Sequence, residues 1–338
     1  MKKADNNFSE NDIRPKKFDG GRLKAFFEDV ATLNSQKDNF VLVKCPACDG
    51  KKNRYKFSKF GFDYVECDSC ETLFMNPRPS QKILDEFYRN SSAYTFWNKH
   101  IFPSSEKNRR EKMFKPRVDK ILEFCRKYNI KTESILEVGA GFGTFCEEMK
   151  SRNVFNQVIG VEPTPELANT CRQKGIEVIE SPIEKVLLAK SQKFNAIVNF
   201  EVIEHLFNPR QFVEACRKSL LPGGLLVITC PNSKGFDFLT LGKDCNSVDH
   251  EHLNYFNPKS ISKLISKVGF KILEVITPGR LDAELVRNKI NEGGLDISNQ
   301  LFLRTILIDK WLELGSKFQD FLAENGLSSN MWVVARKV

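Results

Sequence analysis

Two of the chain's four histidines and two carboxylates fall within four consecutive residues, Asp249 to His252. Histidine titrates near neutral pH, and a neighbouring carboxylate can orient the imidazole ring and stabilise its charge when it takes up a proton. We therefore predict that His252 acts as a general base with the help of Glu251. The alternative is a structural acidic-histidine turn that caps the helix expected after Pro258.

A glycine-rich turn is the second place where the sequence suggests chemistry. Its glycines, Gly139, Gly141 and Gly143, follow an apolar segment and precede a helical one. Glycine lets the backbone approach a ligand closely, and the free amide groups at a helix N-terminus can bind polar groups. Dinucleotide-binding turns share this pattern, so the glycines alone do not identify the ligand.

Two carboxylates beside the glycine-rich turn favour S-adenosylmethionine (SAM) as that ligand. Glu137 lies two residues before the first glycine and suits an anchor for the ammonium side of a methionine moiety. Glu162 ends the next predicted strand, where ribose hydroxyls would be held. A glycine turn that serves only helix–strand packing is the simpler alternative, but it does not account for both carboxylates.

Four cysteines form two Cys-x-x-Cys pairs, Cys45 with Cys48 and Cys67 with Cys70. Two such turns joined by a hairpin can bring four thiolates to tetrahedral positions, which is the arrangement of a closed structural zinc site. A redox motif is the alternative, but redox Cys-x-x-Cys motifs usually occur singly at the start of a helix. We predict a structural zinc ion that stabilises the fold and does no chemistry.

Short apolar segments alternate with helical ones from residue 134 to residue 338, which predicts a parallel α/β sheet. The predicted strands are Ile135–Val138, Val158–Glu162, Glu177–Ile179, Ala196–Phe200, Leu225–Thr229, Lys271–Ile276 and Met331–Ala335. A helical stretch at about 280–328 is expected to form a cap that helps to wall a substrate pocket. The sheet should follow a polar lead-in (1–40) that is loosely ordered or packs as an arm, a cysteine domain of small β-hairpins (41–79) and a helical connector (80–133).

From Ser134 to Lys337 the chain resembles class I SAM-dependent methyltransferases. Besides the glycine-rich turn, the resemblance rests on the segments Ser181–Glu184, Phe194–Leu206 and Leu221–Val227. It implies a seven-stranded Rossmann-like methyltransferase sheet preceded by a small zinc-ribbon-like domain. It also implies that Ile183 lies near the adenine of SAM and that Phe200 and Glu201 lie near the sulfonium.

Glu204 and His205 follow the same predicted strand as Glu201. They are either substrate contacts or ordinary residues at the start of a helix.

The cysteine segment, the sheet and the Glu-His-Leu-x-Tyr-Phe sequence at 251–256 together resemble methyltransferases of bacterial surface-polysaccharide and deoxysugar clusters. Nucleotide-sugar C-methyltransferases are their best-understood relatives, and in these a Tyr-x-Glu-His loop lies beside the sugar. Glu251 and His252 match that loop, whereas Asp249 stands where the tyrosine is expected, and the chain ends at Val338 without their further C-terminal domain. The resemblance therefore implies a small sugar or nucleotide-sugar acceptor and leaves O-, N- and C-methylation open.

Composition is typical of a globular protein, with 41% hydrophobic and 28% charged residues. No apolar run is long enough to cross a bilayer, and the polar N-terminus does not resemble a signal peptide, so we expect a cytoplasmic protein. The formal net charge is +9, and much of the excess lies between Lys107 and Lys131. Helical apolar spacing in part of that stretch favours a solvated basic face, and nucleic acid is not the expected partner.

Two other functions fit the same motifs. An RNA base methyltransferase can also join a four-cysteine zinc module to this sheet, and it would use a basic face with aromatic side chains such as Tyr94, Phe96 and Trp97. A non-catalytic SAM-binding scaffold, with a zinc domain that recruits a partner, would have the same cofactor motifs.

Overall fold

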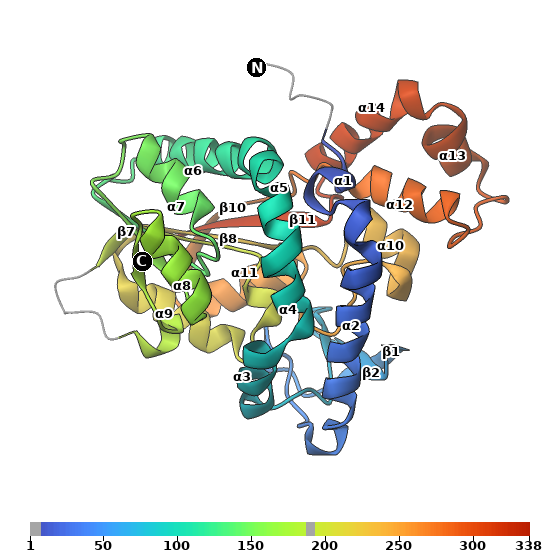
Figure 1. Cartoon of the computed structure of the whole chain (residues 1–338), viewed down its shortest axis with the longest axis horizontal. Coiled ribbons are helices and arrows are strands. Elements are labelled where there is room, and N and C mark those ends of the chain that lie inside the picture. The colour runs from blue at the N-terminus through green and yellow to red at the C-terminus, as the bar shows by residue number, and fades with distance from the viewer. Residues whose placement is uncertain (1–7, 187–192) are drawn as a thin grey trace.

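A seven-stranded sheet forms the centre of the molecule (Figure 1), in a computed structural model that describes residues 8–186 and 193–338. The strands lie in the order β10-β11-β8-β7-β4-β5-β6. β4 to β8 are parallel, and β11 pairs antiparallel with β8 and β10. The strands are β4 (Ser134–Val138), β5 (Gln157–Val161), β6 (Glu177–Ile179), β7 (Phe194–Phe200), β8 (Leu220–Pro231), β10 (Phe270–Ile276) and β11 (Asn330–Lys337). All seven predicted strands are present, and the predicted Rossmann-like sheet is confirmed.

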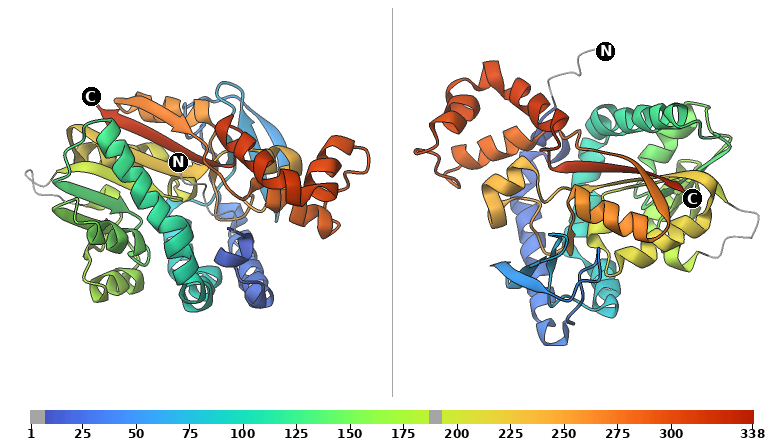
Figure 2. Two further views of the ribbon diagram at one scale, coloured as in Figure 1. Left: turned by 90° about the horizontal axis from the view of Figure 1, so that it is seen from above. Right: turned by 180° about the vertical axis from the view of Figure 1, so that it is seen from behind.

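Helices cover both faces of this sheet and extend beyond it at both ends of the chain (Figure 2). The α-helices are α1 (Glu10–Ile13), α2 (Asp19–Asn34), α3 (Gln81–Asn90), α4 (Ser92–Phe96), α5 (Phe102–Arg109), α6 (Lys115–Lys127), α7 (Thr144–Ser151), α8 (Pro165–Gln173), α9 (Pro209–Ser219), α10 (Phe236–Leu241), α11 (Pro258–Lys267), α12 (Asp282–Asn291), α13 (Leu301–Arg304) and α14 (Trp311–Glu324).

Alternate side chains of each central strand enter different cores. Ile135 and Val227 pack with α6 and α7 on one face, whereas Leu136 and Ile228 pack with α9 and α11 on the other. Strands buried on both faces have near-continuous apolar sequences, which is why they could be recognised without a structure.

A second, antiparallel sheet contains β1 (Asn53–Lys59), β2 (Phe62–Cys67), β3 (Leu73–Met75) and β9 (Asn254–Tyr255) in that order. β1 to β3 belong to the cysteine segment, but β9 lies between β8 and β10 in the sequence. The small sheet therefore extends beyond the segment 41–79.

The segment 41–43, at the start of the region predicted to form small β-hairpins, is not a strand. Only Val41 forms an isolated bridge, with Arg78, and the amide of Val43 donates to the side chain of Asn76 at 2.9 Å. Leu42 is 80% exposed, so its apolar side chain marks no buried strand face.

The two ends of the chain add helices around the sheet. The stretch expected as a loose lead-in or packing arm contains α2, which lies beside α4 (Figure 1). The stretch expected as a cap forms α12, α13 and α14, which stand at one end of the molecule with α10 against α12 (Figures 1 and 2). Within the described residues, no helix is long and apolar enough to cross a membrane.

Candidate functional site

The carboxyl ends of the parallel strands meet at one edge of the large sheet. The strand order reverses between β4 and β7, since β5 and β6 lie on one side of β4 while β7 and β8 lie on the other. In open parallel sheets, ligands bind outside the carboxyl ends at such a reversal. The glycine-rich turn, Glu162 and Glu201 all follow strand ends at this edge, so the structure brings the predicted cofactor residues together.

The glycine-rich turn leaves space at its middle glycine. Gly141 has a positive φ of 54°, and a Cβ built on it would meet nothing within 4 Å. By contrast, a Cβ on Gly139 would lie 2.7 Å from a methyl group of Val202. Gly141 is therefore the point where the backbone offers open space to a ligand, while Gly139 is required for packing.

Glu162 is bonded directly to this turn. One carboxylate oxygen accepts the amide of Gly141 at 2.8 Å, and the other accepts the amide of Thr164 at 2.9 Å. Burial raises the pKa of Glu162. Each oxygen keeps a second lone pair, so the carboxylate can also accept hydrogen bonds from a ligand.

Glu137, the predicted ammonium anchor, is almost fully buried on β4. Its carboxyl group accepts a hydrogen bond from the Cys146 thiol at 3.1 Å, and burial raises its pKa to about 8. A positively charged ligand group nearby would favour its ionised form.

Ile183 and Phe200 are both buried near strand ends. Ile183 lies in a short 3₁₀ helix, Ile183–Lys185, that follows β6. Phe200 ends β7, and its ring packs against those of Phe145 and Trp332. Each can offer an apolar surface to a flat or aliphatic part of a cofactor.

Glu201 has a backbone conformation that non-glycine residues seldom adopt, with a φ of 55°. Its carboxylate accepts hydrogen bonds from the Thr229 hydroxyl at 2.5 Å and the Asn330 side-chain amide at 3.0 Å. Residues held in such conformations concentrate at functional sites. This backbone and these bonds fix the carboxylate at the end of β7.

Arg117 is a site residue that the sequence did not identify. Its guanidinium lies 4.8 Å from the centre of the Phe200 ring and faces Glu201, and burial lowers its pKa. Among the described residues it has no recorded hydrogen bond or ion pair. The signal was its position in α6, four residues before the buried Ile121 and seven before the buried Phe124, which places it on the inner face rather than the solvated one.

His252 is held in one orientation by its own loop. Its Nδ1 lies 2.7 Å from the carbonyl oxygen of Ser247. A carbonyl can only accept, so Nδ1 carries the proton and Nε2 keeps the lone pair that a base needs.

The carboxylate closest to the His252 ring belongs to Asp249 rather than to Glu251. Asp249 Oδ2 lies 3.5 Å from Nδ1 of His252, while Oδ1 accepts the amides of Glu251 and His252 at 2.9 Å each. Glu251 points instead towards His250, with 3.7 Å between Oε1 and Nε2. The loop therefore brings together Asp249 and His252, and separately Glu251 and His250.

Glu204 and His205 lie against His252 and have unsatisfied polar atoms. Among residues 8–186 and 193–338, neither oxygen of the fully buried Glu204 carboxyl has a hydrogen-bond partner, and burial together with Glu201 raises its pKa well above the usual value. Nδ1 of His205 has no partner among these residues either, and burial lowers the pKa of His205 to about 3. The His205 and His252 rings are 4.6 Å apart. Ligand atoms of Glu204, His205 and His252 lie within 4.8 Å of one another, so these three residues could also hold a divalent cation.

A second cluster contains Asp29, His250 and Glu251. Nε2 of the buried His250 lies 3.9 Å from Asp29 Oδ2, and its ring packs edge-on against Phe26 and Phe87. Asp29 also caps α4, accepting the Ser91 hydroxyl at 2.6 Å.

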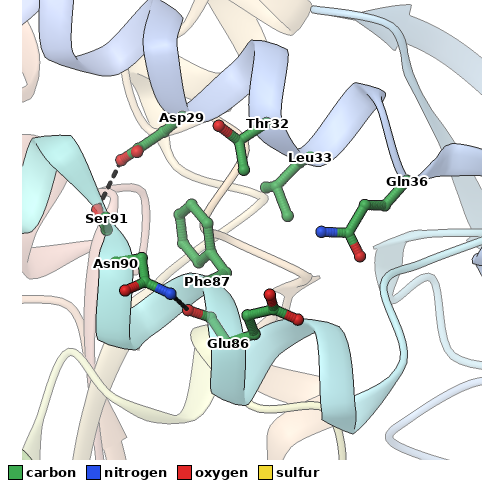
Figure 3. A pocket seen from close by; sticks show the side chains of 8 residues that line it. All are labelled: Asp29, Thr32, Leu33, Gln36, Glu86, Phe87, Asn90 and Ser91. Atoms are coloured by element: carbon green, nitrogen blue, oxygen red, sulfur yellow. Dashed lines mark hydrogen bonds between the residues drawn. The ribbon is translucent and has the colours of Figure 1, made fainter.

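The cavity beside Asp29 measures about 70 Å³ (Figure 3). It is lined by Asp29, Thr32, Leu33, Gln36, Glu86, Phe87, Asn90 and Ser91. Ligand pockets usually occupy about 300–1,000 Å³, so this cavity suits a few water molecules rather than a substrate.

The four cysteine side chains meet at one point and fit a zinc ion. All four are buried, their sulfur atoms lie within 4.8 Å of one another, and the Cys45–Cys70 and Cys48–Cys67 pairs are each 3.5 Å apart. Tetrahedral zinc–sulfur bonds of about 2.3 Å place sulfur atoms about 3.8 Å apart.

The two cysteine turns have matching backbones. Asp49 and Glu71 have positive φ angles of 62° and 57°, and their amides donate to the carbonyls of Cys45 and Cys67, each at 2.9 Å. A matched pair of turns around one sulfur cluster is the geometry of a structural zinc knuckle rather than of a redox pair.

Many of the basic residues between 107 and 131 are paired with carboxylates. Arg110 contacts Glu106, Glu147 and Glu148, and further pairs join Lys112 to Asp12 and Lys127 to Glu274. The positive charge of this stretch is therefore partly balanced locally.

Comparison with known proteins adds a family and several distant relatives. Residues 106–275, half of the chain, match the family model described as a methyltransferase domain. The ubiquinone biosynthesis O-methyltransferase of Cereibacter sphaeroides is 26% identical over 147 residues, which cover 40% of this chain and 59% of the relative. The human mitochondrial enzyme of the same name is 25% identical over 158 residues, 42% of each chain. This chain thus matches 59% or less of the length of these two relatives.

Two solved structures match the chain in a structural comparison, at low sequence identity. A SAM-dependent methyltransferase from Archaeoglobus fulgidus covers 70% of this chain and all of its own, with 18% identity and a TM-score of 0.47. A second, from Clostridium acetobutylicum, covers 71% of this chain and 98% of its own, with 12% identity and a TM-score of 0.46.

Proposed function

We propose that this chain, which belongs to the family of methyltransferase domains, transfers the methyl group of SAM to a small hydroxylated acceptor. The observation that carries the proposal is a juxtaposition at one sheet edge. The open space at Gly141 is bordered by Glu162. At the same edge Glu204 and His205, which have polar atoms without partners among the described residues, follow β7 and lie against His252.

The cofactor residues have separable tasks in this proposal. Bound SAM supplies an electrophilic methyl group on a positively charged sulfur. Glu162 accepts hydrogen bonds from the ribose hydroxyls while it remains bonded to the glycine-rich turn. Arg117 of α6 places its guanidinium over Phe200 at the end of β7, has no hydrogen-bond or ion-pair partner among the described residues, and pairs with the methionine carboxylate. The carboxylate of Glu201 stabilises the positive charge of the Arg117 guanidinium.

His252 takes the proton of the acceptor in this scheme. Bound SAM would supply the methyl group to the acceptor oxygen, and Nε2 of His252 would take the hydroxyl proton. Asp249 then stabilises the imidazolium from 3.5 Å. Burial and the charges of Asp249 and Asp29 raise the pKa of Glu251, whose carboxyl group points towards His250. A cation held by Glu204 and the two histidines would instead lower the pKa of the acceptor hydroxyl.

We propose a sugar, free or nucleotide-linked, as the acceptor. The order of cysteine segment, sheet and Glu-His-Leu-x-Tyr-Phe loop supports this class by its resemblance to sugar methyltransferases. The names of the matched relatives, ubiquinone biosynthesis O-methyltransferases, support oxygen as the accepting atom. A phenolic hydroxyl is the competing acceptor, because the reduced form of a quinone carries hydroxyl groups on an aromatic ring.

The RNA alternative has less support from the local structure. Tyr94, Phe96 and Trp97 are half-buried, Trp97 lies between the guanidinium groups of Arg14 and Arg109, and Phe96 packs on Phe18. These rings are engaged within the protein, whereas stacking on bases needs exposed ones.

Calorimetry with SAM, S-adenosylhomocysteine and NAD tests the cofactor part of the proposal. SAM and S-adenosylhomocysteine should bind, and NAD should not. Methyl-labelled SAM incubated with a panel of nucleotide sugars and dihydroxybenzenes then tests the acceptor by mass spectrometry of the products. A labelled sugar supports the proposal, a labelled phenol replaces the sugar by the competing acceptor, and tight SAM binding without transfer to any member favours the scaffold.

A further inference from the structure

The four-cysteine module, defined here as residues 45–78, contacts the whole length of the segment that contains His252. At one end, the Tyr64 hydroxyl donates to the carbonyl of Asp249 at 2.7 Å. In the middle, the amide of Met75 donates to the carbonyl of Leu253 at 3.0 Å. At the other end, the Asn257 side-chain amide donates to the carbonyls of Cys70 and Glu71, each at 3.1 Å.

Arg78 is the central link between the module and this segment. It is fully buried, and its guanidinium donates to the side chain of Asn254 at 3.1 Å, the carbonyl of Leu253 at 3.5 Å and the carbonyl of Phe207 at 3.3 Å. No carboxylate pairs with it in the described part of the chain. Burying an unpaired charge is costly, so a methionine of similar volume would stabilise a purely structural position better. What arginine adds is a fixed set of directed hydrogen bonds.

Asn254 connects Arg78 to the turn that contains Glu204 and His205, the other residues of the proton-transfer site. Its side-chain amide donates to the carbonyls of Glu204 at 3.2 Å and Leu206 at 2.8 Å. The amide of Leu253 donates to the same Glu204 carbonyl at 2.9 Å. The turn that contains Glu204 and His205 is thus bonded to the segment that follows His252, and both are bonded to Arg78.

We propose that the four-cysteine module is the positioning element of the proton-transfer site, and that Arg78, Asn254 and Tyr64 set the relative placement of His205 and His252. The proposal rests on the function proposed above for these histidines. In this proposal the module positions the residues that act on the acceptor. The SAM residues of β4 and β5 lie outside the hydrogen bonds made by Arg78, Asn254 and Tyr64. If the module unfolds, His205 and His252 should lose their fixed relative placement, while the SAM site should stay intact.

The test uses the full chain as purified, with hydrogen exchange followed by mass spectrometry. Arg78→Met and Tyr64→Phe should speed amide exchange in segments 203–206 and 249–257 at least tenfold. The SAM dissociation constant, measured by calorimetry, should stay within twofold of that of the unsubstituted chain. Arg78→Lys should restore part of the protection, since lysine can reach one or two of the same carbonyls.

Two matched variants control for general destabilisation. Arg217 also donates to backbone carbonyls, those of Gly269 and Val338, and Tyr55 is an exposed tyrosine of the same small sheet. Arg217→Met and Tyr55→Phe should leave exchange in segments 203–206 and 249–257 unchanged.

Histidine ring signals in NMR provide a second readout that needs no acceptor. The chain has four histidines. In Tyr64→Phe the signals of His205 and His252 should shift, while that of His100 should not. If Arg78→Met fails to fold, Tyr64→Phe decides the question, because it removes a single hydroxyl from a packed ring.

Unchanged exchange and unchanged histidine signals in Tyr64→Phe would overturn the positioning role. Failure of the unsubstituted chain to bind SAM would instead remove the proposed function, because calorimetry reports on the cofactor alone.

Discussion

The two carboxylates of the His252 loop should have very different effects on turnover. Asp249→Asn keeps an oxygen that can accept the amides of Glu251 and His252, but it removes the negative charge beside the imidazole. Glu251→Gln also keeps its shape, and the carboxyl group that it alters points towards His250 rather than towards His252. The first substitution should slow methyl transfer, and the second should not.

The distance between Asp249 and His252 gives the size of the effect. Two unit charges 3.5 Å apart attract by about 5 kcal/mol at an effective dielectric constant of about 20. If roughly half of the imidazolium charge has formed in the transition state, Asp249→Asn loses about 2 kcal/mol, which is roughly thirtyfold in kcat. Glu251→Gln should change kcat by less than about threefold.

The assay is steady-state transfer from methyl-labelled SAM to the acceptor identified by the product screen. Calorimetry should give SAM dissociation constants for both variants close to that of the unsubstituted chain, since neither residue follows the strands that bind the cofactor. A Glu251→Gln variant slower than Asp249→Asn would refute the assignment of Asp249 as the partner of His252. It would restore the pairing of Glu251 with His252 expected from the sequence.

Four further predictions concern the base, the cofactor, the metal and the buried Asp237 of α10. His252→Ala should lower turnover by about a hundredfold to ten-thousandfold with SAM affinity nearly unchanged, whereas normal turnover would show that the loop is structural. Gly141→Arg should abolish SAM binding in calorimetry because its side chain fills the open space at the turn. Metal analysis should find about one zinc per chain, lost from Cys67→Ser together with cooperative unfolding of the module. Burial raises the pKa of the Asp237 carboxyl group to about 7, so the folded chain binds a proton at this group more tightly than the unfolded chain does. The free energy of unfolding should therefore fall as the pH rises from about 4 to 7. In urea titrations, Asp237→Asn should make the free energy of unfolding depend less steeply on pH over this range.

The sheet could be predicted because each of its strands carries its own signal. β4, β7 and β8 are buried on both faces, and a doubly buried strand has a near-continuous apolar sequence. β9 has only two residues and pairs with β3 of the cysteine segment. Strand pairing between segments so far apart in sequence depends on the tertiary fold, and no local sequence pattern predicts it.

The sequence identified candidate residues in the His252 loop, but it did not predict which carboxylate contacts which histidine. The sequence placed Glu251 next to His252, and adjacent residues were expected to interact. Asp249 turns the chain instead, because its carboxylate accepts the two following amides and leaves Glu251 pointing towards His250. The basic residues between 107 and 131, Arg117 among them, were assigned together to a solvated face from the helical apolar spacing, whereas the spacing of Arg117 to Ile121 places it inwards.

The end of β7 keeps polar groups in a state that a folded chain usually avoids. Glu204 and Asn199 are fully buried, and neither oxygen of Glu204 and neither polar side-chain atom of Asn199 has a hydrogen-bond partner among the described residues. Each such group costs about 1–3 kcal/mol when it stays unpaired. A ligand that supplies the missing partners recovers this free energy on binding, and a ligand without the matching hydroxyl does not. If the acceptor binds at this strand end, as proposed, we expect its discrimination to come from groups that destabilise the unliganded fold.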